Sequence, residues 1–332
     1  MSGLRFLSFT ERGKALAESL CAALGGTALC TRDRGEFSLR DWTEEAFRAG
    51  DDLVFVGAAG IAVRAVAPFL KSKASDPAVV AVDEGGSFVI PLVSGHLGGA
   101  NALARRVAGL CGGTPVITTA TDVNGRFAVD LWAGKQGLIL LEPERIRKVS
   151  SGLLAGETVL FHSLWPIGGT IPEGVAAGEA CDFAVDFHRS PEGALHLTPR
   201  TAVLGVGCRK GTPRERLEAV FGDFCRENDL LAECICAAAT IDLKAEEPGL
   251  LEFCEAHGWP LTVYGAEKLA AAAGEFTASE FVKKTTGVDN VCERSCALAA
   301  GETPAVRKYA RDGVTLALAV KPPVLDWSWK DE

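Results

Sequence analysis

Apolar and polar positions alternate along the first 120 residues in a way that predicts strands and helices in turn. Some apolar residues form short continuous runs, which are typical of strands buried on both faces, and others recur at helical spacing. This alternation predicts a mostly parallel sheet with helices on its faces. The expected strands are 4–9, 53–56, 77–82, 87–93 and 115–119, and the expected helices include 11–24 and 100–110.

The pattern weakens over residues 135–199, where Gly and Pro are frequent. We expect a short helix at 143–154 and one strand at 158–161 there, with the rest a linker. Regular alternation then returns. It predicts a strand at 201–206, helices at 213–226, 249–257, 279–286 and around 291–299, and a strand pair at 305–310 and 314–320.

The predicted fold class is therefore α/β, with an N-terminal, mostly parallel sheet flanked by helices, a small middle segment and a second α/β domain. The expected domains are residues 1–134, 135–199 and 200–332, since 332 residues exceed one ordinary domain. The polar C-terminal stretch, DWSWKDE, is expected to be peripheral.

Charge and cysteine content narrow the function classes. A net charge of −9 argues against nucleic acid and anionic membranes as partners, because both require a basic face. The eleven cysteines include no CxxC pair and no zinc-type spacing, so we expect free thiols and no metal site in the protein. The first residues have no signal-peptide core, and no apolar run is long enough to span a bilayer, so a cytoplasmic protein is expected.

The stretch 80–104 has the strongest signs of a site. His96 lies in a glycine-rich loop after the strand at 87–93, and ligands of open α/β sheets bind beyond the carboxyl ends of strands. A histidine can accept or return a proton near neutral pH. Alternatively, His96 holds the turn through hydrogen bonds to the backbone.

Other candidates surround this loop. Asp83 and Glu84 either act as a base, orient a water or bind a cation, or they are ordinary residues of a solvated turn. Ser94 with Gly95, Gly98 and Gly99 either presents backbone N–H groups to a carboxylate or only caps the helix that follows. Asn101, at the start of that helix, is a further candidate for binding the ligand.

Further polar residues follow other predicted strands. Arg64 suits a carboxylate ligand, and Thr118, Thr119 and Asp122 either bind a ligand or cap a turn. The segment Gly205–Gly211, GVGCRKG, has the spacing G-x-G-x-x-x-G, which does not match the dinucleotide fingerprint, so no nicotinamide or flavin is expected. Arg209 and Lys210 remain candidates for an anionic group, whereas no partner can be assigned to Cys208 as a nucleophile.

Long blocks of sequence resemble a known family. The segment 60–122, which contains DPAVVAVDE, SGHLGGAN and TPVITTATD, is similar to the N-terminal region of the CbiG family, the cobalt-precorrin 5A hydrolases of anaerobic cobalamin biosynthesis. The later blocks LGVGCRKGTPRERLEAVF, TIDLKAEEPGLLEFCEAHGWPLTVY and FTASEFVKKTTGVDNVCERSCALAAG resemble that family's C-terminal domain, which also occurs alone as CobE. The resemblance covers nearly the whole chain and is loosest over 135–199.

The resemblance implies a hydrolase that opens the ring A δ-lactone of a cobalt-bearing tetrapyrrole and releases the former meso carbon with its methyl as acetaldehyde. The product would be cobalt-precorrin 5B. No cofactor is implied, because the cobalt arrives with the substrate. Hand-over to other enzymes of the pathway and a homodimer are both compatible with this function. The competing hypothesis is a carrier that binds the tetrapyrrole intermediate without catalysis.

The residue roles are our own assignment from the chemistry, which requires water activation, oxyanion stabilisation and proton delivery. His96 would be the general acid or base, and Asp83 or Glu84 would orient it or the water. Ser94 and the backbone from Gly95 to Gly99 would receive the lactone carboxylate. The peripheral acetates and propionates would be held by Arg64, Arg209 and Lys210.

Overall fold

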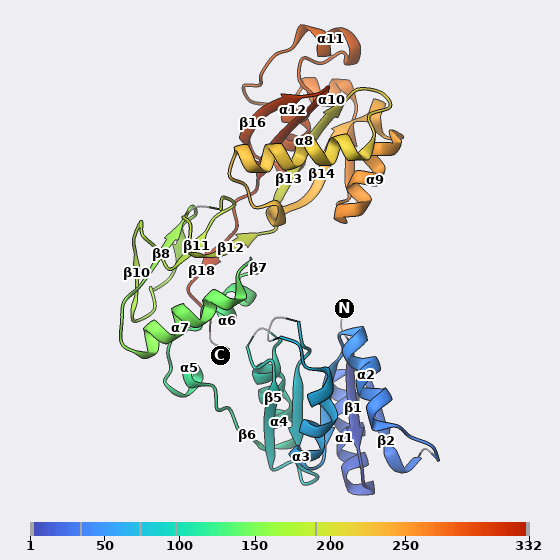
Figure 1. The fold of residues 1–332 in the computed structure, drawn as a ribbon, viewed down its shortest axis with the longest axis vertical. Helices are drawn as coiled ribbons and strands as arrows, with labels where there is room; N and C mark the ends of the chain where they lie inside the picture. Colours follow the sequence, from blue (N-terminus) through green and yellow to red (C-terminus); the bar gives the residue numbers. More distant parts are fainter. Residues whose placement is uncertain (1–2, 34, 73–74, 97, 190, 330–332) are drawn as a thin grey trace. The chain divides into compact units, whose positions relative to one another are not determined.

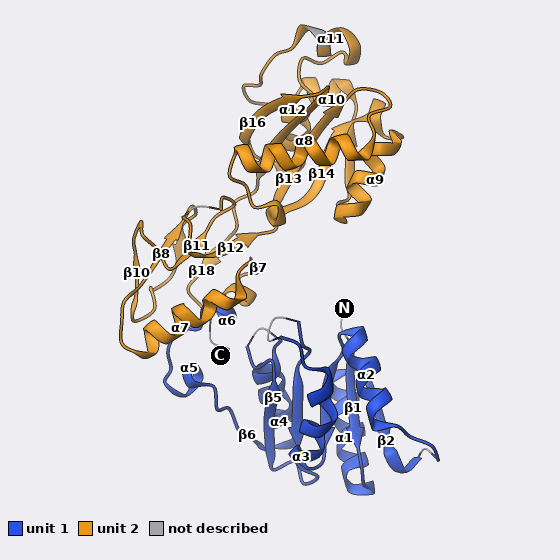
Figure 2. Ribbon diagram, in the orientation of Figure 1, with its two compact units in different colours: residues 1–132, 329–332 blue, residues 133–328 orange. Residues whose placement is uncertain are grey.

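The computed structural model describes residues 3–33, 35–72, 75–96, 98–189 and 191–329 (Figure 1). The chain divides into two compact units, one of residues 1–132 and 329–332 and the other of residues 133–328 (Figure 2). Each unit is described separately. Among the described residues, no helix has the length and apolar character needed to cross a membrane.

The first unit is built on a six-stranded sheet with the strand order β2-β1-β3-β4-β5-β6. Strands β1 to β4 run parallel, whereas β5 is antiparallel to β4 and parallel to β6. The strands are β1 (Leu4–Ser8), β2 (Thr27–Cys30), β3 (Asp52–Val56), β4 (Val79–Val82), β5 (Phe88–Val93) and β6 (Thr114–Pro115).

Helices cover both faces of this sheet because successive strand residues point to opposite sides. Phe6, Val54 and Val80 pack with α1 and α4 on one face, and Leu7 and Phe55 pack with α2 and α3 on the other. This arrangement confirms the predicted mostly parallel sheet. The helices are α1 (Glu11–Leu24), α2 (Leu39–Ala49), α3 (Ala59–Val66), α4 (Ala100–Cys111), α5 (Ala120–Val123) and α6 (Val129–Lys135).

The direction of β5 decides where the glycine-rich loop lies. Strands β4 and β5 form an antiparallel hairpin in which Val82 pairs with Val89 and Val79 pairs with Val93. The loop after Val93 therefore lies at the edge where the parallel strands begin. The expectation that this loop occupies the crevice at their carboxyl ends was wrong, because β5 reverses direction relative to β1, β3 and β4.

The second unit begins with a sheet that the sequence analysis missed. Residues 135–199 were expected to be mostly linker, but they form a five-stranded sheet of order β10-β8-β11-β12-β7, and the expected helix is present as α7. Several of these strands have only three residues, too few for an alternating pattern to stand out. The elements are β7 (Leu138–Leu140), α7 (Ile146–Leu154), β8 (Val159–Ser163), β9 (Ile167–Gly168), β10 (Val175–Ala177), β11 (Phe183–Val185) and β12 (Leu195–Pro199).

The C-terminal stretch is not wholly peripheral. Strand β18 (Leu325–Asp326) pairs with β9, and the Trp327 ring packs edge-on against Phe161 with 4.8 Å between centroids. Trp327 is buried, so this part of the C-terminal stretch packs into the second unit.

The last sheet of the second unit has the order β15-β14-β13-β17-β16, with the first three strands parallel and β17 antiparallel to both β13 and β16. The expected elements of this part are all present, so the second α/β domain is confirmed. The expected elements are β13 (Ala202–Cys208), α8 (Arg214–Glu227), α9 (Pro248–His257), α11 (Glu280–Thr286), α12 (Cys292–Ala300), β16 (Pro304–Arg311) and β17 (Val314–Val320). Three further elements were not expected: β14 (Ile235–Ile241), β15 (Leu261–Tyr264) and α10 (Ala266–Ala270).

Candidate active site

The loop between β5 and α4 is held in shape by its own small residues. Ser94 has a left-handed φ of 57°, and its hydroxyl donates to the carbonyl oxygen of Asp76 at 2.8 Å. A Cβ at Gly98 would lie 2.3 Å from that of Ser94, and one at Gly95 would lie 2.9 Å from Asn101 Oδ1. Both glycines are thus required by close packing. Leu97, between them, lies outside the described residues.

The amino end of α4 has largely used its N–H groups. Ala100 N donates to Ser94 O at 3.1 Å, Asn101 N donates to Gly95 O at 2.9 Å, and Gly99 N donates to His96 O at 2.9 Å. These bonds satisfy groups that would otherwise attract an anion. These three N–H groups are therefore already bonded within the loop, and the binding of a carboxylate by Ser94, Gly95, Gly98 and Gly99 stays a prediction.

His96 is held between two carboxylates. Its Nε2 lies 2.7 Å from Asp122 Oδ2 and its Nδ1 lies 3.2 Å from Asp130 Oδ2. A carboxylate oxygen only accepts, so a ring that satisfies both bonds must donate from both nitrogens. The geometry therefore favours the imidazolium form. The side chain is 12% exposed, so part of it faces outward.

Asp122 connects this histidine to α4. Its Oδ1 accepts from Arg105 Nη2 at 2.7 Å. Its Oδ2, which also contacts His96 Nε2, accepts from Asn101 Nδ2 at 3.2 Å. Asn101 also donates to Thr119 Oγ1 at 3.0 Å. Of the predicted site residues, the structure thus brings together His96, Asn101, Thr119 and Asp122. With Arg105 and Asp130 we call them the His96 cluster.

Two members of the cluster were missed in the sequence. Arg105 lies one helical turn after Asn101 on α4, so the pair shares a face. Asp130 is a buried acid in the apolar stretch FAVDLW. A charged residue in such an apolar run indicates a partner, because burying an unpaired charge is costly. Asp130 Oδ1 accepts no hydrogen bond from the part of the chain that the structure describes.

The electrostatics follow from these contacts. Burial by itself would lower the pKa of His96, but the hydrogen bonds and charges of Asp130 and Asp122 outweigh it and raise that pKa. Burial would raise the pKa of Asp122, but His96 and Arg105 together lower it. Both shifts favour the ion pair near neutral pH.

The raised pKa can be measured directly. With histidines labelled for NMR, the His96 ring is expected to titrate above the ordinary value of about 6.5. Asp130→Asn should lower the pKa of His96, because it removes the contact that raises this pKa most. The sign follows from linkage: the pair's stabilisation is complete below the unfolded pKa and is lost as pH rises through the folded pKa. An unchanged His96 pKa in Asp130→Asn would contradict the geometry. The pKa of His188, in the other unit, serves as the control; contact with Asp186 raises it.

Asp83 and Glu84 do not join the cluster. They lie in the turn at the other end of the β4–β5 hairpin from Ser94. Asp83 accepts from Gly85 N at 2.8 Å and from Phe88 N at 2.6 Å, so its carboxylate holds its own turn. The turn interpretation of this pair is the one that the structure supports, and the hairpin rules out their orienting His96.

Glu84→Gln therefore separates the two interpretations. Under the function that the family resemblance implies, we expect the variant to keep the wild-type rate of turnover within about twofold, because a surface change of this kind perturbs little. The measurement is the initial rate of that reaction, with Asp130→Asn as the positive control. A tenfold or larger loss of rate in Glu84→Gln would show that the turn takes part in the site.

The remaining candidates lie apart from the cluster. Arg64 is an exposed residue in the last turn of α3, and Thr118 is exposed before α5. Arg209 and Lys210 belong to the second unit, where they line a cavity at the carboxyl ends of β13 and β14. Burial is the main reason that the pKa of Cys208 is raised, so this neighbour remains a thiol and gains no nucleophilic character.

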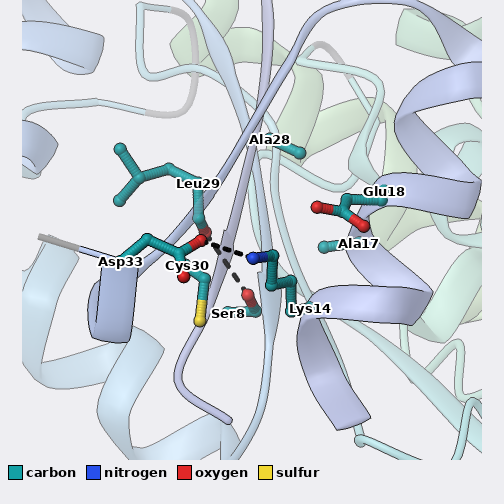
Figure 3. Close-up of a pocket in the computed structure, with 8 residues that line it drawn as sticks. All are labelled: Ser8, Lys14, Ala17, Glu18, Ala28, Leu29, Cys30 and Asp33. Carbon is teal, nitrogen blue, oxygen red and sulfur yellow. Dashed lines mark hydrogen bonds and ion pairs between the residues drawn. The ribbon is translucent and has the colours of Figure 1, made fainter. Parts of the chain in front are cut away.

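The carboxyl edge of the first sheet also has a pocket, which lies where β1 and β2 end (Figure 3). Its volume is about 190 Å³, below the usual range for small-molecule sites. Two of its three charged groups pair with each other, since Lys14 Nζ lies 2.8 Å from Asp33 Oδ2. Ser8 Oγ likewise donates to Leu29 O at 3.3 Å. This pocket is too small for a large ligand.

Comparison with known proteins places these residues in a family. The family model described as Cobalamin synthesis G N-terminal matches residues 41–122, and the one described as Cobalamin synthesis G C-terminus matches residues 202–319. A cobalt-precorrin-5A hydrolase of Salmonella typhimurium is 33% identical in an alignment that covers 94% of this chain and 95% of that protein. The chain belongs to the cobalt-precorrin-5A hydrolase family.

Two further relatives agree with this assignment. A cobalt-precorrin-5A hydrolase of Priestia megaterium is 30% identical over 86% of this chain and 82% of its own length. Protein CobE of a Sinorhizobium species is 31% identical over 120 residues, which cover 35% of this chain and 78% of CobE. The family's N-terminal model includes His96, Asn101, Arg105 and Asp122, and ends before Asp130.

No group of histidine, cysteine and carboxylate side chains among the described residues has a metal-binding arrangement. The eleven cysteines are free, and each is buried or half-buried. The expectation of free, mostly buried thiols is thus confirmed.

Proposed function

We propose that the protein is a cobalt-precorrin 5A hydrolase, a carbon–carbon bond hydrolase acting on a lactone tetrapyrrole, and that the His96 cluster carries the chemistry. It opens the ring A δ-lactone, releases acetaldehyde and yields cobalt-precorrin 5B. The observation that carries the proposal is the position of His96 between Asp122 and Asp130 within a chain of this family. A protonated imidazole beside a carboxylate with a free oxygen is a general acid–base pair.

The lactone step uses both groups. Water adds to the lactone carbonyl carbon and gives a proton to Asp130 Oδ1, the buried oxygen that accepts no bond from the described protein groups. The acyl carbon–oxygen bond then breaks, and His96 gives its proton to the released oxygen. One water is consumed, and the proton taken by Asp130 replaces the one lost by His96. Asp122, Arg105 and Asn101 hold the ring in place.

The second step cleaves the carbon–carbon bond. The released oxygen sits on the former meso carbon. When that oxygen gives its proton to the Asp130 carboxylate, the carbon departs with its methyl as acetaldehyde, and the bonding pair remains on the macrocycle, which takes up a proton from His96. The same acid–base pair serves both steps. No cofactor is needed in this scheme, because cobalt enters as part of the substrate.

The other proposed substrate contacts concern the anionic periphery of the tetrapyrrole. Arg64, Arg209 and Lys210 are proposed to hold its acetates and propionates, since an arginine can bind a carboxylate through two parallel hydrogen bonds. Thr118 is proposed as a further contact with the substrate. We also propose the three-domain division 1–134, 135–199 and 200–332, a cytoplasmic location, a homodimer, and hand-over of the product to other enzymes of the pathway.

The test is turnover by the purified protein. Mixed with cobalt-precorrin 5A under anaerobic conditions, it is expected to release one acetaldehyde per substrate over many turnovers. The competing hypothesis, a carrier, predicts stoichiometric binding without acetaldehyde. That result would overturn the proposal.

A further inference from the structure

The position of the Asp130 carboxylate depends on the segment of chain that carries it. Within the described part of the chain, its one hydrogen-bond partner is His96, with 3.2 Å between Asp130 Oδ2 and His96 Nδ1. Asp122, by contrast, has two further partners on α4. The segment 127–133, FAVDLWA, is almost entirely buried. The packing of this segment therefore determines how closely Asp130 approaches His96.

Aromatic rings hold the segment on both sides of the carboxylate. Phe127 comes three residues before Asp130 and Trp132 two residues after it, and their ring centroids are 5.9 Å apart. The ring of Trp329 packs edge-on against Phe127, at 83° and with 5.9 Å between centroids. Trp329 is distant along the chain but belongs to the first unit (Figure 2). Such edge-on pairs stabilise a structure beyond the area that they bury.

The residues just before Trp329 bind the other end of α6. Gln136, which directly follows this helix, donates from Nε2 to Asp326 Oδ1 at 3.3 Å and to Ser328 O at 3.2 Å. Asp326 N donates back to Gln136 Oε1 at 3.0 Å. Asp326 Oδ1 also accepts from Ser328 N at 2.7 Å, which fixes the turn that leads to Trp329. The stretch 326–329 thus contacts the chain both before and after α6.

From these contacts we infer that Trp329 is a positioning residue of the active site, which holds Asp130 against His96 through the ring of Phe127. The inference rests on the proposed function, which gives Asp130 and His96 their roles in the reaction. Trp329 acts through packing alone. Its removal lets α6 shift, and the contact of Asp130 with His96 then weakens.

Replacing Trp329 by alanine in the full-length protein tests this inference. The hydrogen bond and charge of Asp130 raise the pKa of His96, so we expect this pKa, read by NMR, to fall in Trp329→Ala. We also expect kcat for acetaldehyde release to fall about 10- to 10²-fold, because a misplacement of about 1 Å has an effect of this size. Trp329→Phe keeps an aromatic ring at this position and should restore most of both quantities. Circular dichroism confirms that the variants fold.

The matched control is Trp42→Ala. Trp42 is another half-buried tryptophan of the first unit, and it packs edge-on against Phe55, at 78° and with 5.8 Å between centroids. Phe55 faces α2 and α3, whereas α4 covers the opposite face of the sheet. The control therefore removes a similar ring contact away from His96, and it should change neither the His96 pKa nor kcat. An equal fall of the His96 pKa in both variants would overturn the inference.

A double variant shows whether Trp329 acts through Asp130. In Asp130→Asn, where the carboxylate is already absent, adding Trp329→Ala should change the His96 pKa little further, because coupled residues are not additive. The same fall in both backgrounds, or an unchanged His96 pKa in Trp329→Ala alone, would contradict the inference. The pKa is measured without substrate. A wild type that releases no acetaldehyde would therefore refute the proposed function, whereas the pKa comparison decides the role of Trp329.

Discussion

Replacing His96 by glutamine is expected to lower kcat for acetaldehyde release by about 10²- to 10⁴-fold, the usual contribution of a positioned general acid or base. Glutamine keeps one donor and much of the volume but has no ionisable proton. The two carboxylates beside it, Asp122 and Asp130, would then face a neutral group. Steady-state assays of acetaldehyde with cobalt-precorrin 5A measure the effect, and KM should change far less than kcat.

The matched control is His162→Gln, which removes a half-exposed histidine in the other unit whose nearest carboxylate, Asp186, is 3.9 Å away. This variant should retain wild-type kcat. If His96→Gln also keeps kcat within about threefold, the loop does not supply a catalytic proton and the role assigned to His96 is wrong.

Replacing Asp122 by alanine is expected to have the second-largest effect, because it removes a carboxylate shared by His96, Arg105 and Asn101. Without this mostly buried carboxylate, His96 and Arg105 lose the partner of their charges. The first unit should therefore be destabilised by about 3 kcal/mol. The substitution should also lower kcat by about 10²-fold or more, because His96 loses a contact that raises its pKa and also loses its fixed orientation. Chemical denaturation and acetaldehyde assays measure the two effects.

A structural role alone would lower stability without changing the protonation of His96. We therefore expect the His96 pKa, read by NMR, to fall in Asp122→Asn, which retains the side-chain shape. Asp41→Asn, an exposed carboxylate on α2, should change neither quantity. Normal turnover and an unchanged His96 pKa in Asp122→Asn would show that Asp122 serves only the fold.

The sequence predicted many of the longer elements, but it missed α2 (Leu39–Ala49) and β14 (Ile235–Ile241). The alternation in 1–120 predicted the first sheet, and the helices around 213–226 and 249–257 agree with α8 and α9. The three-residue strands of 135–199 were missed because an alternating pattern needs more positions to appear. Their pairing is decided by tertiary contacts, such as Phe161 stacked on Phe183 with 5.8 Å between centroids.

The site was predicted in part for a similar reason. His96 and Asp122 were both identified, but their contact was not, because it joins residues that are distant in sequence. Asp83 and Glu84 were placed with His96 because they are close along the chain. The direction of β5 separates them, and a hairpin places the two ends of its strands apart. Local sequence spacing could not indicate that reversal.

The central claim is that protonated His96 delivers the proton that opens the lactone. The pH dependence of single-turnover acetaldehyde formation tests it most directly, measured from about pH 5 to pH 9 with enzyme in excess. Because contacts with Asp130 and Asp122 raise the pKa of His96, the wild-type rate constant should fall through an inflection above about 6.5. The residual rate of His96→Gln should lack that fall. An identical inflection in both proteins, or a wild-type rate that rises with pH over this range, would contradict the account.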